Sequence, residues 1–221
     1  FPATKNVGKT QIDFVDMPNA VQSEIAIVNA VELKMTDKDY FATTMANQIL
    51  GGGGEGRLFL NLREANGWTY GAYSSIGSGK YTSKFKATAS VRNSVTDSAV
   101  VEFMKEIHKI RTEKVTEDEL KLAKAKFIGN FVMGTQKAGT IASFALRTKT
   151  QDLPVDFYEN YIKNLNAVTV EDVQKAANRY FQAENLRIII VGKAADVLPG
   201  LEKLPYKLHF FDKFGKPTSK P

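Results

Sequence analysis

The stretch from Tyr81 to Arg92, YTSKFKATASVR, decides the fold class because its side chains alternate between apolar and polar. This period of two is the pattern of a β-strand that has one buried face. The inward positions are predicted to be Tyr81, Phe85, Ala87, Ala89 and Val91, and the outward positions Lys84, Lys86 and Arg92. Such a strand is typical of an antiparallel sheet with one face in water.

Strand patterns also occur on both sides of this segment. They cover residues 10–17, 23–33, 70–79 and 186–191. Met17-Pro18-Asn19 is predicted to form the turn between the first two strands. The segment LRIIIV at 186–191 is apolar throughout and is closed by Gly192, which is the pattern of a strand buried on both faces.

Amphipathic helical patterns fill most of the remaining chain. They cover residues 40–50, 57–65, 97–114, 117–131, 138–149, 155–165 and 170–181. Two of the helices are preceded by a capping-box pattern, which begins at Thr116 in one and at Thr169 in the other. Strands mixed with blocks of helices predict an α+β fold. We expect a two-layer sandwich with a mostly antiparallel sheet and helices packed on one face.

The domain boundaries follow from these patterns. Residues 10–204 are predicted to form a single domain, preceded by a lead-in at 1–9 and followed by a basic, aromatic tail at 205–221. The chain begins Phe1-Pro2, without an initiator methionine or a signal peptide, which predicts a segment of a longer chain.

The net charge of +6 is located at the two ends of the chain. Residues 1–9 contribute +2 and residues 203–221 contribute +4, whereas the body between them holds 23 basic and 23 acidic residues. A nucleic-acid-binding protein concentrates its basic residues on the folded body. We therefore expect no nucleic-acid partner. No apolar run approaches the ~18 residues of a membrane span, so no transmembrane segment is predicted.

The chain is poor in metal ligands. It has no cysteine and two histidines, His108 and His209, which lie far apart in sequence. A zinc site, a disulfide framework and a cysteine nucleophile within this segment are therefore excluded. Each histidine is expected to have a structural role, His108 at the border of an apolar helical stripe and His209 in the tail.

The run Gly51-Gly52-Gly53-Gly54 is the most conspicuous local feature. A phosphate-binding loop requires a strand before it and a Lys-Ser/Thr pair after it, and this run instead follows a helix. It is predicted to be a flexible loop between two helices. A role in contacting peptide stays open, because backbone without side chains lets a ligand approach closely.

The segment 62–74, LREANGWTYGAYS, holds the strongest candidate site. Arg63 is predicted to lie on the last turn of a helix and Tyr70 at the start of a strand, and Gly67 permits a sharp reversal between them. The two side chains are therefore expected to converge. A guanidinium and a phenol are strong donors that can polarise a carbonyl or stabilise an oxyanion. The alternative is a helix-ending arginine and a strand tyrosine with no common role.

The same segment resembles the second domain of the pitrilysin/insulinase-type zinc peptidases, a family that includes the mitochondrial processing peptidase subunits. The matching residues are Gly56–Phe59, Leu62–Glu64 and Gly67–Ser74. Arg63 and Tyr70 have the family spacing of seven. Gln22–Ile25, the capped helix at 116–128 and the order of elements are similar too, so the resemblance covers most of residues 10–204.

The resemblance implies a metallohydrolase-like fold that is duplicated in each polypeptide. In the family, the first copy binds zinc through His-x-x-Glu-His and a distal Glu, and the second copy has lost this motif. The chain lacks the motif and resembles the second copy. It is then expected to close a peptide-binding chamber against a zinc-bearing domain, on the same chain or a companion chain. Zinc would be held by that domain, and this segment would not be catalytically competent alone.

The resemblance also implies roles for individual residues. Arg63 and Tyr70 would reach the substrate carbonyl across the chamber. Trp68 stands where the family mostly has a smaller residue, and it would line a substrate pocket or simply pack. Gly51–Gly54 are candidates for substrate contact.

Other functions stay open. The parent protein could have lost zinc in both halves and serve as a peptide-binding or scaffold subunit. A weaker alternative is a free-standing binding module that uses Gly51–Gly54 and the basic tail. Self-association is expected through the apolar patch that faces the partner domain. By resemblance to bacterial relatives, the expected location is the periplasm or cell envelope.

Overall fold

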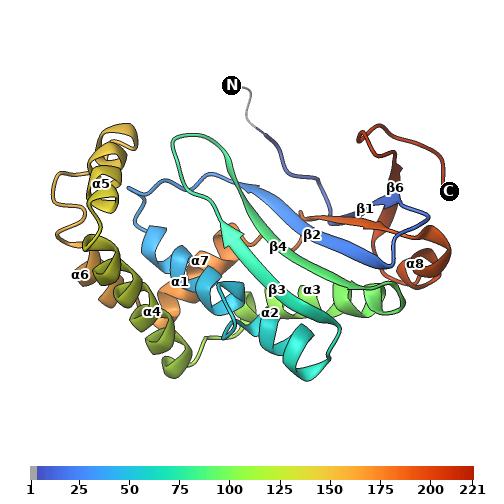
Figure 1. The fold of residues 1–221 in the computed structure, drawn as a ribbon, viewed down its shortest axis with the longest axis horizontal. Helices are drawn as coiled ribbons and strands as arrows, with labels where there is room; N and C mark the ends of the chain where they lie inside the picture. The colour runs from blue at the N-terminus through green and yellow to red at the C-terminus, as the bar shows by residue number, and fades with distance from the viewer. Residues whose placement is uncertain (1–3) are drawn as a thin grey trace.

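The alternating segment forms strand β4 (Ser83–Arg92), which pairs antiparallel with β2 (Gln22–Val31) along its whole length. The prediction that Tyr81 points inward is wrong, because Tyr81 lies before the start of the strand and is exposed. The computed structural model describes residues 4–221. Within them a six-stranded sheet has the order β3-β4-β2-β5-β1-β6 (Figure 1). The remaining strands are β1 (Gln11–Asp16), β3 (Thr69–Ile76), β5 (Arg187–Gly192) and β6 (Lys207–Phe211).

Helices cover one face of the sheet (Figure 1). The helical segments include α1 (Tyr40–Gly51), α2 (Arg57–Phe59), a π-helix (Leu60–Ala65), α3 (Thr96–Thr112), α4 (Glu117–Thr135), α5 (Ala138–Thr150), α6 (Tyr161–Asn166), α7 (Val170–Tyr180) and α8 (Ala194–Leu201). Of these, α5 packs on α4 and projects beyond the sheet (Figure 1). The predicted α+β fold, with its mostly antiparallel sheet, is confirmed. Between residues 4 and 221, no helix combines the length and the apolar character needed to cross a bilayer.

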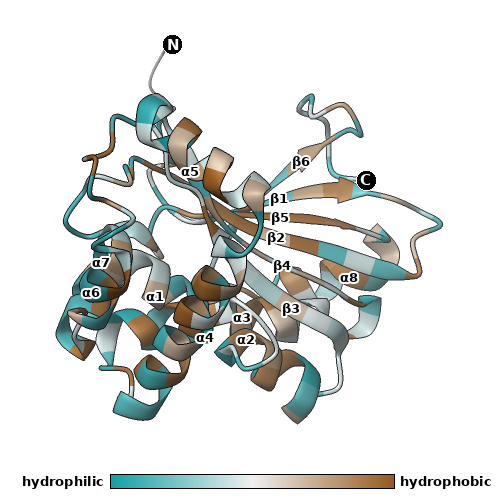
Figure 2. Ribbon diagram, turned by 60° about the vertical axis from the view of Figure 1, so that its left-hand side comes forward, coloured by the Kyte–Doolittle hydropathy of each residue, from teal (hydrophilic) through white to brown (hydrophobic). Residues whose placement is uncertain are grey.

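The core lies between the sheet and the helix layer. Phe85 of β4 is fully buried and stacks on Phe181 at the end of α7, with ring centroids 4.4 Å apart. In Figure 2 brown, apolar stretches run along β5 and β1 and through part of β2. Two polar residues, Ser23 and Asn29, are buried on the inner face of β2, and Asn29 Nδ2 donates to the Tyr180 carbonyl at 3.0 Å.

The pairing of the first two strands differs from the expectation. Met17–Asn19 does not close a hairpin, because β5 lies between β1 and β2. β5 pairs antiparallel with β2 and parallel with β1. The physical reason is the composition of β5: a strand apolar on both faces is most stable in the interior of a sheet. Side-chain alternation reveals which face of a strand is buried, but not which strand is its neighbour.

Two elements near the C-terminus were not predicted. α8 contains Pro199 and is followed by a turn, so its sequence has a helix-breaking signal inside the helix. β6 falls within residues 205–221 and pairs parallel with β1. The chain then folds back, with a bridge between Phe211 and Pro217. This part of the predicted tail therefore packs on the edge of the sheet.

α4 is anchored at its first turn. Both hydrogen bonds of the predicted capping box are present between Thr116 and Glu119. Arg57 of α2 also donates to Glu119, from Nε at 2.7 Å and from Nη2 at 2.9 Å. Burial raises the pKa of Glu119, but the hydrogen bonds from Arg57 and the Thr116 backbone outweigh it, so the pKa lies below its ordinary value.

The Glu119 anchor predicts a pH-dependent stability. The pKa of Glu119 is lower in the folded state than in the unfolded state. Ionised Glu119 therefore stabilises the fold fully at pH values above the unfolded-state pKa, and this stabilisation is lost as the pH falls through the folded-state pKa. Glu119→Gln should lower the free energy of unfolding by about 1–2 kcal/mol at pH 7. The difference from wild type should shrink towards pH 3, as measured by urea unfolding. Glu117→Gln, an exposed change in the same turn, is the matched control, and an equal loss in both variants would contradict the anchor.

Candidate functional site

Arg63 lies in the π-helix, immediately before the chain reverses. The backbone N–H of Asn66 donates to the Asn61 carbonyl at 3.1 Å, which is the i to i−5 bond of a π-turn. The backbone N–H of Gly67 donates to the Arg63 carbonyl at 2.9 Å. Gly67 has φ = 61°, in the left-handed region that favours glycine. The predicted helix end, glycine turn and strand start are all present. Wide helical turns of this kind concentrate at functional sites.

Tyr70 lies just after the turn, on the edge strand β3. The residue is 89% exposed, and the pairing of β3 with β4 shifts register between Thr69 and Ala72. Irregularities of this kind re-aim side chains at the edges of sheets. The Arg63 side chain is 46% exposed. Both donors therefore face solvent on the same reversal of the chain, and the convergence of their tips stays a prediction.

Two aromatic side chains support Arg63, and sequence reasoning missed both. The Arg63 guanidinium lies 4.8 Å from the centroid of the Phe59 ring. Phe59 in turn packs on Tyr73 of β3, with centroids 5.8 Å apart. The Tyr73 ring occupies space that is open because residue 71 is glycine: a Cβ at Gly71 would lie 2.6 Å from a carbon of the Tyr73 ring. The available signals were the i, i+4 spacing of Phe59 and Arg63 and the i, i+2 spacing of Gly71 and Tyr73.

The opposite side of the π-helix is held by carboxylates on α3. Asn61 Nδ2 donates to Glu102 Oε2 at 2.7 Å and to Glu106 Oε1 at 2.9 Å. The Asn61 hydrogen bond is the main cause that holds the pKa of Glu102 below its ordinary value, against burial and together with Lys105. Glu106 is buried. Sequence reasoning did not identify this contact, because it joins residues more than 40 positions apart.

The first glycine of the run 51–54 has a packing role. Gly51 is buried at the end of α1, and a Cβ there would lie 2.6 Å from Ser74 N of β3. The following residues lie nearer the surface, and Gly54 is exposed. A Cβ at Gly53 would meet Lys126, which forms an ion pair with Glu55 at 2.9 Å. The run therefore packs between α1, β3 and α4, and substrate contact by its exposed part stays a prediction.

Trp68 is partly buried and packs against the main core. Its amide donates to the Leu62 carbonyl at 3.0 Å, which ties the start of β3 to the π-helix. The structure therefore provides a packing role for Trp68. A contact with substrate stays a prediction.

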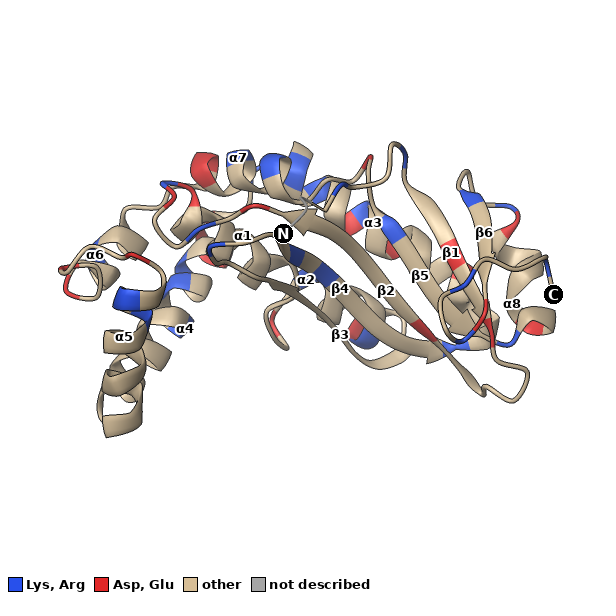
Figure 3. Cartoon of the chain, turned by 90° about the horizontal axis from the view of Figure 1, so that it is seen from above, with Lys and Arg blue, Asp and Glu red and all other residues tan. Residues whose placement is uncertain are grey.

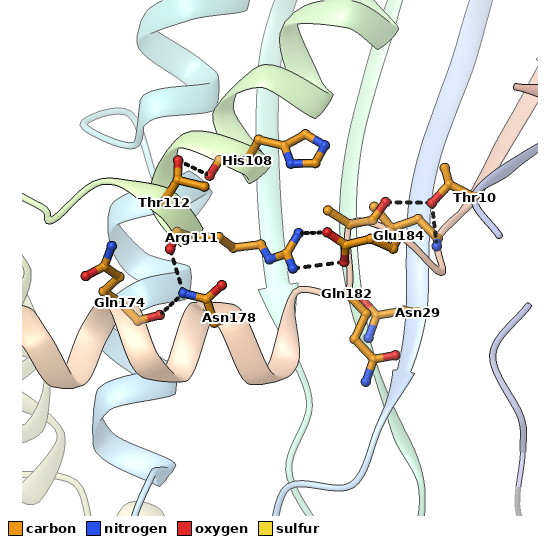
Figure 4. Close-up of polar contacts among 11 residues, drawn as sticks. Thr10, Asn29, His108, Arg111, Thr112, Gln174, Asn178, Gln182 and Glu184 are labelled. Carbon is orange, nitrogen blue, oxygen red and sulfur yellow. Dashed lines mark hydrogen bonds and ion pairs between the residues drawn. The ribbon is translucent and has the colours of Figure 1, made fainter. Parts of the chain in front are cut away.

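The two histidines do not form a metal site. Within residues 4–221, no group of three or more His, Asp or Glu side chains is arranged to hold a metal ion. His108 lies on α3 close to Arg111, whose guanidinium pairs with Glu184 through two contacts of 2.8 Å (Figure 4). Hydrogen bonds from Arg111 are the main cause that lowers the pKa of Glu184. His209 lies in β6, opposite Asp13 of β1. The donor set of this chain therefore does not fit zinc.

Comparisons with known proteins point to one family. A family model described as "Peptidase M16 inactive domain" matches residues 2–127. The chain is 23% identical over 167 residues to the "Probable inactive metalloprotease YmfF" of Bacillus subtilis. It is 26% identical over 148 residues to the "Uncharacterized zinc protease SCO5738" of Streptomyces coelicolor. These alignments cover 76% and 66% of this chain but 38% and 32% of the relatives, so the chain spans about a third of their length.

Solved structures share the fold. The peptidase M16 inactive domain from Pseudomonas fluorescens matches with a TM-score of 0.79 and 23% identity, over 87% of this chain and 45% of that chain. The periplasmic protease PqqL from Escherichia coli matches with a TM-score of 0.69 and 15% identity, over 86% of this chain and 21% of that chain.

The packing of the glycine run predicts different outcomes at its two ends. Gly51→Ala should destabilise the protein by about 1–3 kcal/mol, because the new methyl group collides with the β3 backbone. Gly54→Ala is the control and should change stability by less than about 0.5 kcal/mol, since its nearest neighbour is a Phe59 ring atom at 3.8 Å. Urea unfolding measures both. Equal stabilities would contradict the packing role of Gly51.

Proposed function

Because the chain belongs to the peptidase M16 inactive-domain family, we propose that it closes the peptide-binding chamber of a zinc-dependent metallopeptidase. In this proposal the zinc and its catalytic residues belong to a companion domain, on the same or another chain. The present chain supplies a wall of the chamber and the Arg63–Tyr70 pair. It is not catalytically competent alone.

The observation that carries this proposal is the outward presentation of two donors on one turn. Tyr70 is almost fully exposed and Arg63 is half exposed, supported on the Phe59 ring. A guanidinium and a phenol placed in a chamber from which water is excluded would stabilise negative charge that develops on a peptide carbonyl oxygen. Donors of this kind bind and orient substrate without a metal of their own.

The apolar surface of the α4–α5 hairpin supports the proposal that this chain binds a companion domain. Between Lys126 and Arg147 the sequence has one charged residue, Lys137. None of the residues of α5 is buried. The exposed apolar side chains of the hairpin include Val132, Met133, Ile141 and Leu146. In Figure 3 the projecting part of α5 is drawn almost entirely in tan, the colour of uncharged residues, and weakly charged apolar surfaces of this kind mark contacts with other proteins. The companion domain is the proposed partner, and self-association is expected in its absence.

The alternative function is a peptide-binding or scaffold subunit whose parent has no zinc in either half. The two curated relatives represent these alternatives, since one is named an inactive metalloprotease and the other a zinc protease. The presence of His-x-x-Glu-His in the companion domain would distinguish them. Similarity to a periplasmic protease supports a location in the periplasm or cell envelope of a bacterium.

The proposal predicts that both donors are needed for peptide hydrolysis by the intact two-domain protein. Arg63→Ala and Tyr70→Phe should each lower kcat by roughly 10²–10³-fold, the usual effect of losing one oxyanion donor. Zinc content and melting temperature should not change. The assay is cleavage of a quenched fluorescent peptide.

Arg179→Ala and Tyr81→Phe are the matched controls, because they make the same chemical changes on α7 and in the β3–β4 turn, away from the candidate site and from the α4–α5 hairpin. Both should retain full activity. Unchanged activity in Arg63→Ala and Tyr70→Phe, with zinc bound and the fold intact, would overturn the donor assignment.

A further inference from the structure

The π-helix has two faces with different tasks. Arg63 lies on the outer face, over Phe59. Asn61, two residues earlier, lies on the face that meets α3. Residues two apart on a helix point in nearly opposite directions, so the orientation of Asn61 determines the direction in which Arg63 leaves the helix.

Every hydrogen-bonding group of the Asn61 side chain is used. Its amide nitrogen donates to Glu102 and Glu106, and its Oδ1 accepts from Asn66 Nδ2 at 2.9 Å. The same Asn66 nitrogen also donates to the Asn61 carbonyl at 2.9 Å. The network thus connects α3, the π-helix and the residue that ends it.

The two carboxylates are placed for this contact. Glu102 and Glu106 are four residues apart on α3 and face the same side. Lys105 lies 3.1 Å from Glu102 and balances part of the charge. An amide with two donors satisfies both carboxylates, and charge-assisted hydrogen bonds of this kind are the stronger ones in proteins.

We infer that Asn61 is a positioning residue for Arg63, and that Glu102 and Glu106 are its anchor on α3. The network fixes the rotation of the π-helix, and the Phe59 ring then receives the guanidinium. The part of this inference that concerns activity rests on the proposed function. The part that concerns the direction of Arg63 does not.

Asn61→Asp tests the inference because aspartate has the same shape but no donor. It places a third carboxylate against Glu102 and Glu106, so the contact should open and the arginine should move from the Phe59 ring. The readout is the ¹H–¹³C spectrum of the 221-residue chain with labelled arginine δ-carbons. In wild type the Arg63 signal should be displaced by the ring current of Phe59, and in Asn61→Asp that displacement should be lost.

Three further variants complete the experiment. Arg63→Lys assigns the signal, and Phe59→Leu shows its position without the ring. Asn130→Asp, on an exposed position of α4, is the control for the same chemical change and should leave the Arg63 signal in place. Asn61→Ser removes the two-donor contact without adding charge. If Asn61→Asp fails to fold, Asn61→Ser should show the same loss of the ring-current displacement.

A reciprocal variant distinguishes positioning from general loss of stability. Asn61→Asp combined with Glu102→Gln and Glu106→Gln reverses the polarity of the network, since two amides now donate to one carboxylate. This triple variant should restore the ring-current displacement. An unchanged Arg63 signal in a folded Asn61→Asp protein, or no restoration in the folded triple variant, would overturn the inference.

Activity of the two-domain protein provides the final readout. Asn61→Asp should lower kcat by roughly 10–100-fold with little change in KM, and the triple variant should recover it. If Arg63→Ala retains activity, the proposed function fails, while the spectrum still decides whether Asn61 positions Arg63. If Arg63→Ala is inactive but Asn61→Asp is fully active, the positioning role fails and the proposed function stands.

Discussion

The structure depends on the burial of one face of the sheet against one layer of helices. The stack of Phe85 on Phe181 lies at the centre of this contact and joins β4 to the end of α7. The inner face is formed by β2, β4 and β5, where Ile27, Ala87 and Ile188 are fully buried. The helix layer lies on one side of the sheet (Figure 1), and the edge strand β3 carries the exposed Tyr70.

The candidate site lies where the helix layer returns to the sheet. α1 ends at Gly51 in close contact with β3, and the π-helix ends at the Gly67 reversal. Arg63 lies over the Phe59 ring, and Asn61 of the same π-helix is hydrogen-bonded to Glu102 and Glu106 of α3. The packed part of the fold thus lies directly beside a side chain that is exposed to solvent, and binding sites in general require such support if they are to act precisely.

The sequence predicts the regular elements because their signals are local. Alternation in β4 and the capping boxes at Thr116 and Thr169 need only neighbouring residues, and all three are present. Strand order, the position of β5 and the short β6 depend on contacts between distant segments, which no local pattern contains. The same holds for the site: the turn around Gly67 is readable, whereas the contact of Asn61 with α3 is not.

Three irregular features of the backbone lie close to the candidate site, and their position there supports the proposal that this region has a function. The π-helix, the left-handed Gly67 and the register shift after Thr69 occur within ten residues of Arg63. Each is less favourable than regular structure and persists because the surrounding packing maintains it. A fold that only needed to connect a helix to an edge strand could use a regular helix and a simple turn. The irregular connection instead leaves Arg63 and Tyr70 exposed while Leu62 and Ala72 remain in the core.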